Sequence, residues 1–122
     1  MEDYRHTLGR SGEDAAVQYL ESIGHRVLHR GWRVRHFEID IITETPGVLH
    51  FVEVKTRSGS GGADPSESIG KDKLKNMYLA AQSYLSAHPS KMEISFDAVL
   101  VRTRRDSGAI IEYVEEAFLP FF

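Results

Sequence analysis

The sequence contains no cysteine, one tryptophan and four prolines among its 122 residues. Without cysteine, disulfide bonds and thiolate metal sites are excluded, which favours a reducing compartment. No segment approaches the roughly 20 apolar residues that a membrane-spanning helix needs, so we expect no membrane partner. The polar N-terminal segment 1–6 lacks the apolar stretch of a signal peptide, which predicts a cytoplasmic protein.

A large excess of charge of one sign is also missing, since the formal net charge is −3. The hydrophobic share of 41% and the charged share of 27% are typical of a globular protein, and the length predicts one domain over 1–122. Segment 25–36 nevertheless contains four arginines, three histidines and no acid. Such a stripe binds phosphates even on an acidic protein, because screening confines charge effects to about 8 Å. A solvated basic edge strand explains the pattern equally well.

Two adjacent segments predict an antiparallel hairpin near the middle of the chain. Segments 37–43 and 48–57 are rich in β-branched and aromatic residues, and a Pro-Gly pair between them favours a turn. If Asp40 lies opposite Glu53, then Glu44 pairs with Leu49 around a four-residue loop at 45–48, a common length for hairpins. A slip of one residue in this register would place the two carboxylates on opposite faces of the sheet.

The residues around this acid pair suggest two different roles. Because side chains alternate along a strand, Lys55 and Arg57 share the face of Glu53. Two carboxylates about one cross-strand spacing apart suit a hard divalent cation such as Mg²⁺, and the Lys55 ammonium would then neutralise a phosphate or help to activate water. A salt bridge from Glu53 to Lys55 or Arg57 on an exposed strand face is the alternative, and the residues alone leave both open.

An amphipathic helix is predicted from about Leu8 to Ile23, ending at Gly24. Ala16 and Leu20 fall on the same stripe as Glu13, so a carboxylate is expected on the face that packs inward. Such a carboxylate needs a partner, and the metal of the acid pair is one candidate. The alternative is that Glu13, near the start of the helix where the dipole favours an acid, extends toward water or pairs with an arginine.

The next segment, 25–35, predicts a strand that frays near Trp32 because of Gly31. His25 and His29 could share a face of this strand and bind a metal. Without a third ligand nearby, structural or phosphate-contacting roles are favoured for both histidines.

A Gly- and Ser-rich segment, 58–70, predicts a flexible loop that is either a substrate-gripping lid or a plain connector. A helix over 71–87 follows, with an apolar stripe formed by Leu74, Met77, Tyr78, Ala81 and Leu85. Lys73 borders this stripe, so its ammonium is expected to reach the edge of the sheet where the acids lie.

Two further strands are predicted near the C-terminus. Segment 93–103 is apolar on both faces, which favours a buried central strand. Asp97 within it is interpreted as a structural aspartate bonded to backbone amides. Segment 109–114 forms the last strand, and the apolar tail 118–122 either packs on the domain or covers a homodimer surface.

The order helix, three strands, helix, two strands resembles the PD-(D/E)XK nuclease superfamily and, within it, the YraN-like family of uncharacterised bacterial proteins. The resemblance runs nearly end to end and is carried by Gly12-Glu13, Ala16, Tyr19-Leu20, Gly24, Arg33, the run Glu38 to Ile42, the run Phe51 to Arg57, Lys73, Tyr84 and Phe96-Asp97. It implies an α/β fold of the restriction endonuclease-like type, with a mixed sheet of about five strands flanked by helices, similar to Holliday-junction resolvases.

Position by position, the resemblance implies that Asp40 and Glu53 bind a metal together with the Val54 carbonyl. It matches Lys55 to the catalytic lysine and Glu13 to the helix-borne acid that completes the site in resolvase-like members. The chemistry follows from analogy with the superfamily, because the resemblance does not supply a cellular role.

The predicted function is therefore a Mg²⁺- or Mn²⁺-dependent endonuclease that hydrolyses phosphodiester bonds in DNA, including branched or nicked DNA. Nucleic-acid contacts are predicted for Arg30, Arg33, Arg35, Arg57, Lys71 and Lys73. The alternative is a catalytically silent nucleic-acid-binding module, which is motivated by the basic stripe and by Phe37. This ring stands where the family pattern has Gly, and it would narrow access to the site. A third hypothesis is a protein-interaction domain that uses the tail 118–122.

Overall fold

The structure of the protein, a computed structural model, describes residues 4–58, 70–104 and 108–118. Its elements are α1 (Tyr4–Ser22), β1 (Arg26–Val34), β2 (Phe37–Thr45), β3 (Val48–Ser58), α2 (Lys71–Ala87), β4 (Glu93–Arg104) and β5 (Gly108–Phe118). The strands form a mixed sheet in the order β1-β2-β3-β4-β5, in which β3 and β4 are parallel and the other pairings are antiparallel. The predicted α/β class and element order are confirmed.

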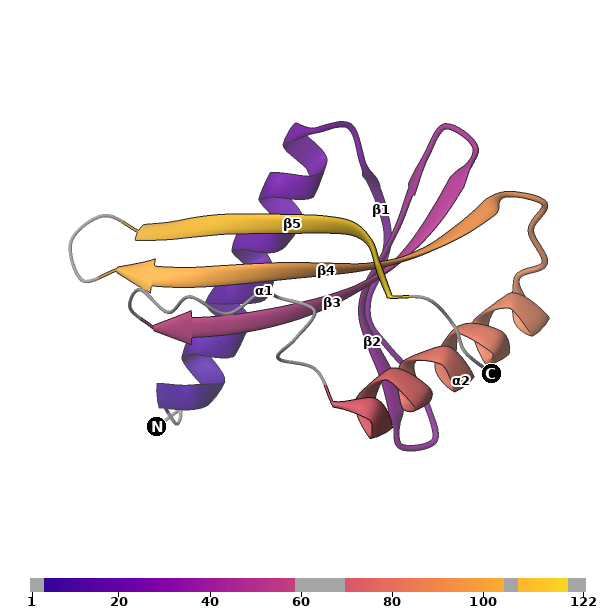
Figure 1. Cartoon of the computed structure of the whole chain (residues 1–122), viewed down its shortest axis with the longest axis horizontal. Helices are drawn as coiled ribbons and strands as arrows, with labels where there is room; N and C mark the ends of the chain where they lie inside the picture. The colour runs from indigo at the N-terminus through magenta and orange to yellow at the C-terminus, as the bar shows by residue number, and fades with distance from the viewer. Residues whose placement is uncertain (1–3, 59–69, 105–107, 119–122) are drawn as a thin grey trace.

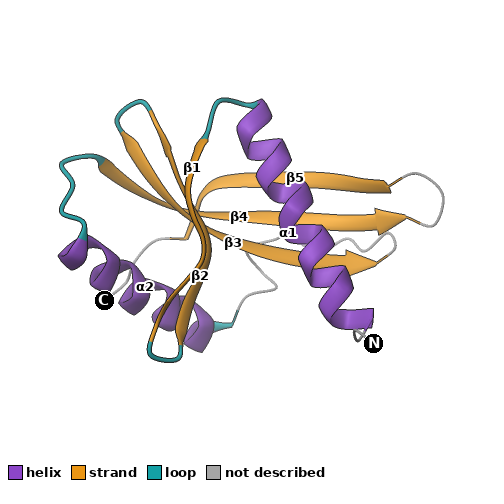
Figure 2. Cartoon of the chain, turned by 180° about the vertical axis from the view of Figure 1, so that it is seen from behind, coloured by secondary structure: helices purple, strands orange, loops and turns teal. Residues whose placement is uncertain are grey.

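The two helices pack on opposite faces of this sheet (Figure 1). Figure 2 shows α1 crossing β3, β4 and β5, whereas α2 lies against β1 and β2. This layering follows from β3, where consecutive side chains alternate between the faces. Phe51 joins the cluster built with α2, and Val52 joins the cluster built with α1. Neither helix of the described residues combines the length and apolar character needed to cross a membrane.

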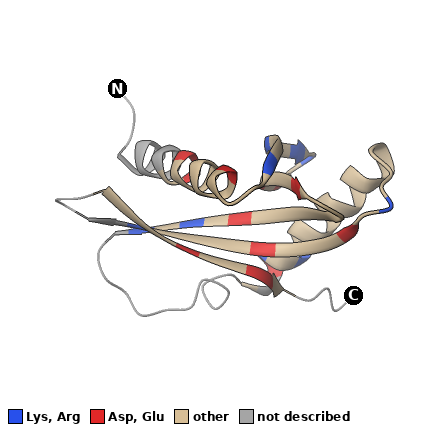
Figure 3. Ribbon diagram, turned by 90° about the horizontal axis from the view of Figure 1, so that it is seen from above, with Lys and Arg blue, Asp and Glu red and all other residues tan. Residues whose placement is uncertain are grey.

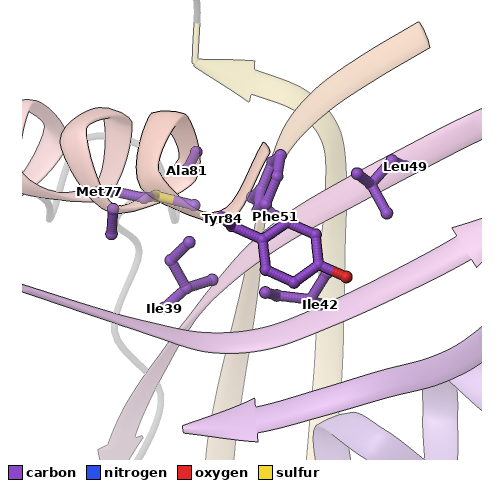
Figure 4. Packing of buried hydrophobic residues seen from close by; sticks show 8 residues of the cluster. Ile39, Ile42, Leu49, Phe51, Met77, Ala81 and Tyr84 are labelled. Carbon is purple, nitrogen blue, oxygen red and sulfur yellow. The ribbon is translucent and has the colours of Figure 1, made fainter. Parts of the chain in front are cut away.

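The core on the α2 side is formed mainly by large apolar side chains from β2, β3 and α2 (Figure 4). The predicted apolar stripe of α2 contributes the buried residues Met77 and Ala81. Ala80 and Tyr84 are buried as well, because both flank the stripe on the face that contacts β2 and β3. The Tyr84 ring packs edge-to-face on Phe51, with 5.7 Å between ring centroids.

Several predicted element boundaries are corrected by the structure. Helix α1 begins at Tyr4 rather than near Leu8. Strand β1 does not fray at Trp32, because that residue pairs with Ile39 and the ladder with β2 continues to Val34. Tertiary pairing thus overrides the local effect of the neighbouring glycine.

The C-terminal strand is also longer than predicted. Phe118 belongs to β5 and pairs with Phe96, so it is not the start of a separate tail. Residues 119–122 and residues 59–69, which make up most of the predicted tail and loop, lie outside the described residues.

Gly12 marks a close approach between α1 and β3. A Cβ atom at this position would lie far inside contact distance of the Thr56 side chain. We therefore expect Gly12→Ala to lower the free energy of unfolding by about 1–3 kcal/mol, because the helix must shift away from the strand. Chemical denaturation checks this, with Gly70→Ala for comparison. Nothing lies within 4 Å of a Cβ at that position, so this variant loses only the glycine N-cap of α2 and should be the less destabilised of the two. Equal stability of the two variants would contradict the expectation.

Candidate active site

The turn between β2 and β3 is shorter than predicted, although the register is as predicted. Glu44 pairs with Leu49, in agreement with the expected alignment of the two strands. The ladder then continues by one further pair, Thr45 with Val48, which leaves Pro46–Gly47 as the turn. The four-residue loop is therefore corrected to a two-residue turn.

Beyond this hairpin, β2 and β3 diverge (Figure 1). Their pairing ends at Ile41 and Val52, one position before Asp40 would face Glu53. From there β2 continues beside β1, and β3 continues beside β4. Asp40 still links the strands, because its Oδ2 accepts a hydrogen bond of 2.8 Å from the backbone N–H of Val54. Both predicted acids therefore lie where the two strands separate.

Glu53 is buried, with 5% of its surface exposed. Its Oε1 lies 3.4 Å from the Nζ of Lys73, and its Oε2 is buried without a hydrogen-bond partner in the described chain. Burial, followed by the nearby charge of Asp40, raises the pKa of Glu53 to about 8. Burial also raises the pKa of Asp40, although the Val54 amide and Lys73 act in the opposite direction. The positive charge of Lys73 thus offsets only part of the effect of burial on the two acids.

Lys73 reaches this acid pair from α2, as the helical spacing predicted. The ion pair of Glu53 is therefore with a residue of another element rather than with Lys55, the local alternative raised by the sequence. Lys55 is half-buried on β3, two residues after Glu53. By strand alternation its side chain leaves the backbone on the same face as Glu53.

Glu13 approaches the same region from α1 but is already paired. The Nε of Arg30 on β1 lies 3.1 Å from Glu13 Oε1, and the Nη2 of Arg30 lies 2.5 Å from Asp14 Oδ1. The charge of Glu13 also contributes, as a smaller cause after burial, to the raised pKa of Asp40. Of the two partners that the sequence left open, the structure shows the arginine, close to the acid pair.

The other basic residues predicted to bind nucleic acid are spread over several elements (Figure 3). Arg33 pairs with Glu38 at 3.0 Å, yet 72% of its side chain is exposed. Arg35 and Arg57 are exposed, and Lys71 begins α2, with a side chain outside the described ones. The stripe on β1 is therefore partly neutralised by acids of its neighbours.

The predicted sharing of a face by His25 and His29 is wrong. A register shift between Val27 and His29 rotates the strand, so the two rings lie in different environments. The Nδ1 of His25 shares a hydrogen bond of 2.7 Å with the Thr43 hydroxyl, whereas the His29 ring packs on Tyr84. The two histidines therefore do not form a metal site together.

Asp97 has the structural role that the sequence indicated, within a polar network that the sequence did not reveal. It accepts a hydrogen bond of 3.0 Å from the backbone N–H of Glu116. It also accepts hydrogen bonds from three side chains, those of His50, Ser95 and Tyr113. The position of His50 offered a signal, since this polar residue lies on the same strand face as the buried Val52.

The donor set of the acid pair fits a divalent cation. Among the described residues, no three His, Asp or Glu side chains surround a common metal position. Mg²⁺, however, is commonly held by one or two carboxylates and completes its coordination with water and substrate oxygens. Asp40 and Glu53 supply these carboxylates, and the unpartnered Oε2 of Glu53 is the atom that a cation would satisfy.

The matching family profile and three similar known proteins all carry the same family name. The sequence profile described as "Uncharacterised protein family UPF0102" matches residues 12–101. A UPF0102 protein of Bacteroides thetaiotaomicron is 39% identical over 113 residues, which cover 93% of this chain and 93% of that protein. A UPF0102 protein of Chlorobium phaeobacteroides is 43% identical over 120 residues, covering 93% and 95%. One of Nitratidesulfovibrio vulgaris is 38% identical over 119 residues, covering 97% and 88%.

Proposed function

The chain belongs to the uncharacterised protein family UPF0102, the YraN-like family that its motifs indicated, and we propose that it is a metal-dependent endonuclease acting on DNA. The family name assigns no activity, so the proposal rests on the site itself. The observation that carries it is the buried pair of Asp40 and Glu53 at the divergence of β2 and β3, with one carboxylate oxygen unpartnered.

Each residue of the site has a role in phosphodiester hydrolysis. Asp40, Glu53 and the Val54 carbonyl would hold Mg²⁺ or Mn²⁺. Such a cation, when bound, supplies Lewis acidity toward the phosphate and makes water more acidic. Glu13, whose carboxylate is fixed by Arg30, would orient the attacking water. Lys55 would neutralise the charge that develops on the phosphate as the ester bond breaks.

Lys73 stabilises the two carboxylates of the site in the absence of substrate. Its ammonium lies 3.4 Å from Glu53 Oε1 and lowers the pKa values of both acids, against the larger effect of burial. Because lysine is a compact charge on a flexible stem, it can turn from the carboxylate to a phosphate oxygen when a cation binds. Nucleic-acid contact by Lys73 therefore fits its position.

A catalytically silent DNA-binding module is the second candidate. It is favoured by the observation that Glu13 and Glu53 are already paired with Arg30 and Lys73, so part of the acidic site is neutralised within the chain. This candidate predicts DNA affinity that falls steeply with salt and is unchanged by Asp40→Asn.

Cleavage assays test the proposal directly. We expect the purified protein to cut nicked or four-way DNA in Mn²⁺, and Asp40→Asn to slow cleavage at least about 100-fold, because the substitution removes the charge but keeps the size. Glu21→Gln, which changes an exposed acid on the same molecule, serves as the control and should cut normally. Absence of cleavage, or equal rates for wild type and Asp40→Asn, would reject the nuclease. Unchanged DNA affinity in Asp40→Asn would then favour the silent module.

A further inference from the structure

The turn that joins β1 to β2 has an unusual composition for its geometry. Val34 pairs with Phe37, so the turn consists of Arg35 and His36 alone. Arg35 has φ of 55°, the left-handed region that two-residue hairpin turns usually fill with Gly, Asn or Asp. Glycine would adopt this left-handed conformation at a lower energetic cost than arginine. The presence of a long cationic side chain at this position therefore indicates a functional role for that side chain.

The side chains at this turn combine a cation with two aromatic rings. The ring centroids of His36 and Phe37 lie 4.2 Å apart, with their planes inclined by 49°. Phe37 is half-buried against the core cluster that includes Met77, whereas His36 is exposed. The imidazole thus rests on a ring that the core holds in place.

Arg35 also differs from the other arginines on this hairpin in its ion pairing. Among the described residues, the ion pairs of this hairpin's arginines involve Arg26, Arg30 and Arg33, and none of them involves Arg35. An exposed guanidinium next to two rings in contact suits nucleic acid, since the guanidinium can bind a phosphate while the exposed ring stacks on a base.

The turn between β1 and β2 lies close to the acid pair along β2. Phe37 and Asp40 lie on the same strand, three residues apart, which corresponds to about 10 Å. In stacked duplex DNA this distance corresponds to about three base pairs along the helix axis. A DNA molecule bound at the acid pair is therefore long enough to reach the turn as well.

We propose that this turn selects DNA in which base stacking is interrupted, with Arg35 binding the sugar-phosphate backbone and the His36–Phe37 ring pair stacking on an exposed base. The inference rests on the proposed nuclease function and assigns the recognition of nicked or branched DNA to this turn. An intact duplex offers no free base face, so the ring pair would find no partner there. A nick or a branch point exposes such a face close to the phosphate to be cut.

Binding measurements on a cleavage-deficient background test the inference. In Asp40→Asn protein with Mg²⁺, we expect a nicked duplex to bind about 10-fold more tightly than an intact duplex of the same sequence. A 2-aminopurine base placed beside the nick should lose fluorescence on binding, because it stacks on the rings. Adding Arg35→Gly or His36→Ala should reduce the preference to about 2-fold or less, and His36→Ala should also abolish the fluorescence change.

Two matched controls separate this effect from a general loss of charge or of an imidazole. Arg26→Ala changes an exposed arginine at the other end of β1, and His88→Ala changes an exposed histidine after α2, so both should keep the preference. Arg35→Gly should at the same time raise Tm, because glycine relieves the left-handed position. A Tm rise with undiminished preference for nicked DNA would overturn the inference.

Parallel cleavage assays of the wild-type protein distinguish failure of this inference from failure of the nuclease. Cleavage of nicked and intact DNA at equal rates would reject the inference but would still support the nuclease function. A preference for nicked DNA that depends on the turn, without any cleavage, supports the inference and rejects the nuclease. If no DNA binds at all, both are rejected.

Discussion

Replacing Glu53 with glutamine is expected to make the protein inactive and, above about pH 6, more stable. The cause lies in the site, where burial and the neighbouring Asp40 raise the pKa of Glu53 from 4.5 to about 8. The folded protein therefore holds a proton on Glu53 at pH values where the unfolded chain has released it. A glutamine keeps the shape of the protonated side chain and carries no titrating group.

The sign of the pH dependence follows from this difference. Because the folded-state pKa is raised, the stability contributed by Glu53 is fully present below pH 4.5 and is lost as the pH rises toward 8. In that window wild type loses stability relative to Glu53→Gln by about 1.4 kcal/mol for each pH unit. Between pH 5.5 and pH 7.5, the gap should therefore widen by up to about 3 kcal/mol.

Urea denaturation of both proteins from pH 5 to pH 8.5 measures this gap. Glu21→Gln serves as the control, because the acid it removes is exposed, and its curve should run parallel to wild type. Parallel curves for Glu53→Gln and wild type would show that the pKa of Glu53 is not raised in the folded protein. Mn²⁺ should raise the Tm of wild type more at pH 8 than at pH 6, since the proton competes with the cation, and it should not raise that of Glu53→Gln.

Asp97→Asn is expected to cost about 3–5 kcal/mol of unfolding free energy, although Asp97 is not part of the acid pair. Asp97 has no exposed surface. It accepts hydrogen bonds of 2.7 Å from His50 Nδ1 and of 2.5 Å each from Ser95 Oγ and the Tyr113 hydroxyl. An asparagine would turn an amide donor toward these donors and leave at least one of them unpaired.

The same aspartate holds the end of β5 in place. Glu116, whose N–H donates to Asp97, has φ of 53°, a left-handed conformation that is unfavourable for a residue with a side chain. Burial alone would raise the pKa of Asp97, but its hydrogen bonds outweigh burial and lower it below 3.8. This contribution is therefore present at neutral pH and is lost only as the pH falls below 3.8, through the folded-state pKa.

Guanidinium denaturation at pH 7 provides the measurement for this variant. Ser95→Ala removes one of the donors and should cost about 1 kcal/mol. The exposed substitution Asp72→Asn removes an acid from the first turn of α2 and should cost less than about 1 kcal/mol. If Asp97→Asn cost no more than Ser95→Ala, the carboxylate would not be the centre of the network.

Much of the fold could be predicted from the local pattern of apolar residues and turn signals. Where the prediction failed, there is a physical reason for the failure. The spacing of apolar residues predicted helix α2 at its observed bounds. The alignment of β2 with β3 was also predicted, from the placement of Asp40 opposite Glu53, although the turn between the strands is shorter than expected. His25 and His29 were misplaced because a bulge in β1 is an irregularity of pairing with the neighbouring strand. The strand was expected to fray near Trp32 because local propensity does not take into account the pairing of β1 with β2.

The candidate site divides in the same way. The sequence by itself determined which side chains of β2, β3 and α1 point toward the candidate site. The reason is that side-chain direction along a strand or helix follows from backbone periodicity. The sequence did not determine that pairing between β2 and β3 stops at Ile41, or that Arg30 is the arginine that pairs with Glu13. The approach of Lys73 to the acids was predicted from helical spacing, but its ion pair with Glu53 in particular was not.

The tertiary structure decided these points because burial and charge act through space between residues that are distant along the chain. His50 and Asp97, separated by 47 positions, meet only because β3 and β4 are adjacent in the sheet. The raised pKa of Glu53 likewise requires the packing that excludes water from its carboxylate. Periodicity sets the direction of each side chain, and only the assembled fold sets its neighbours and its contact with water.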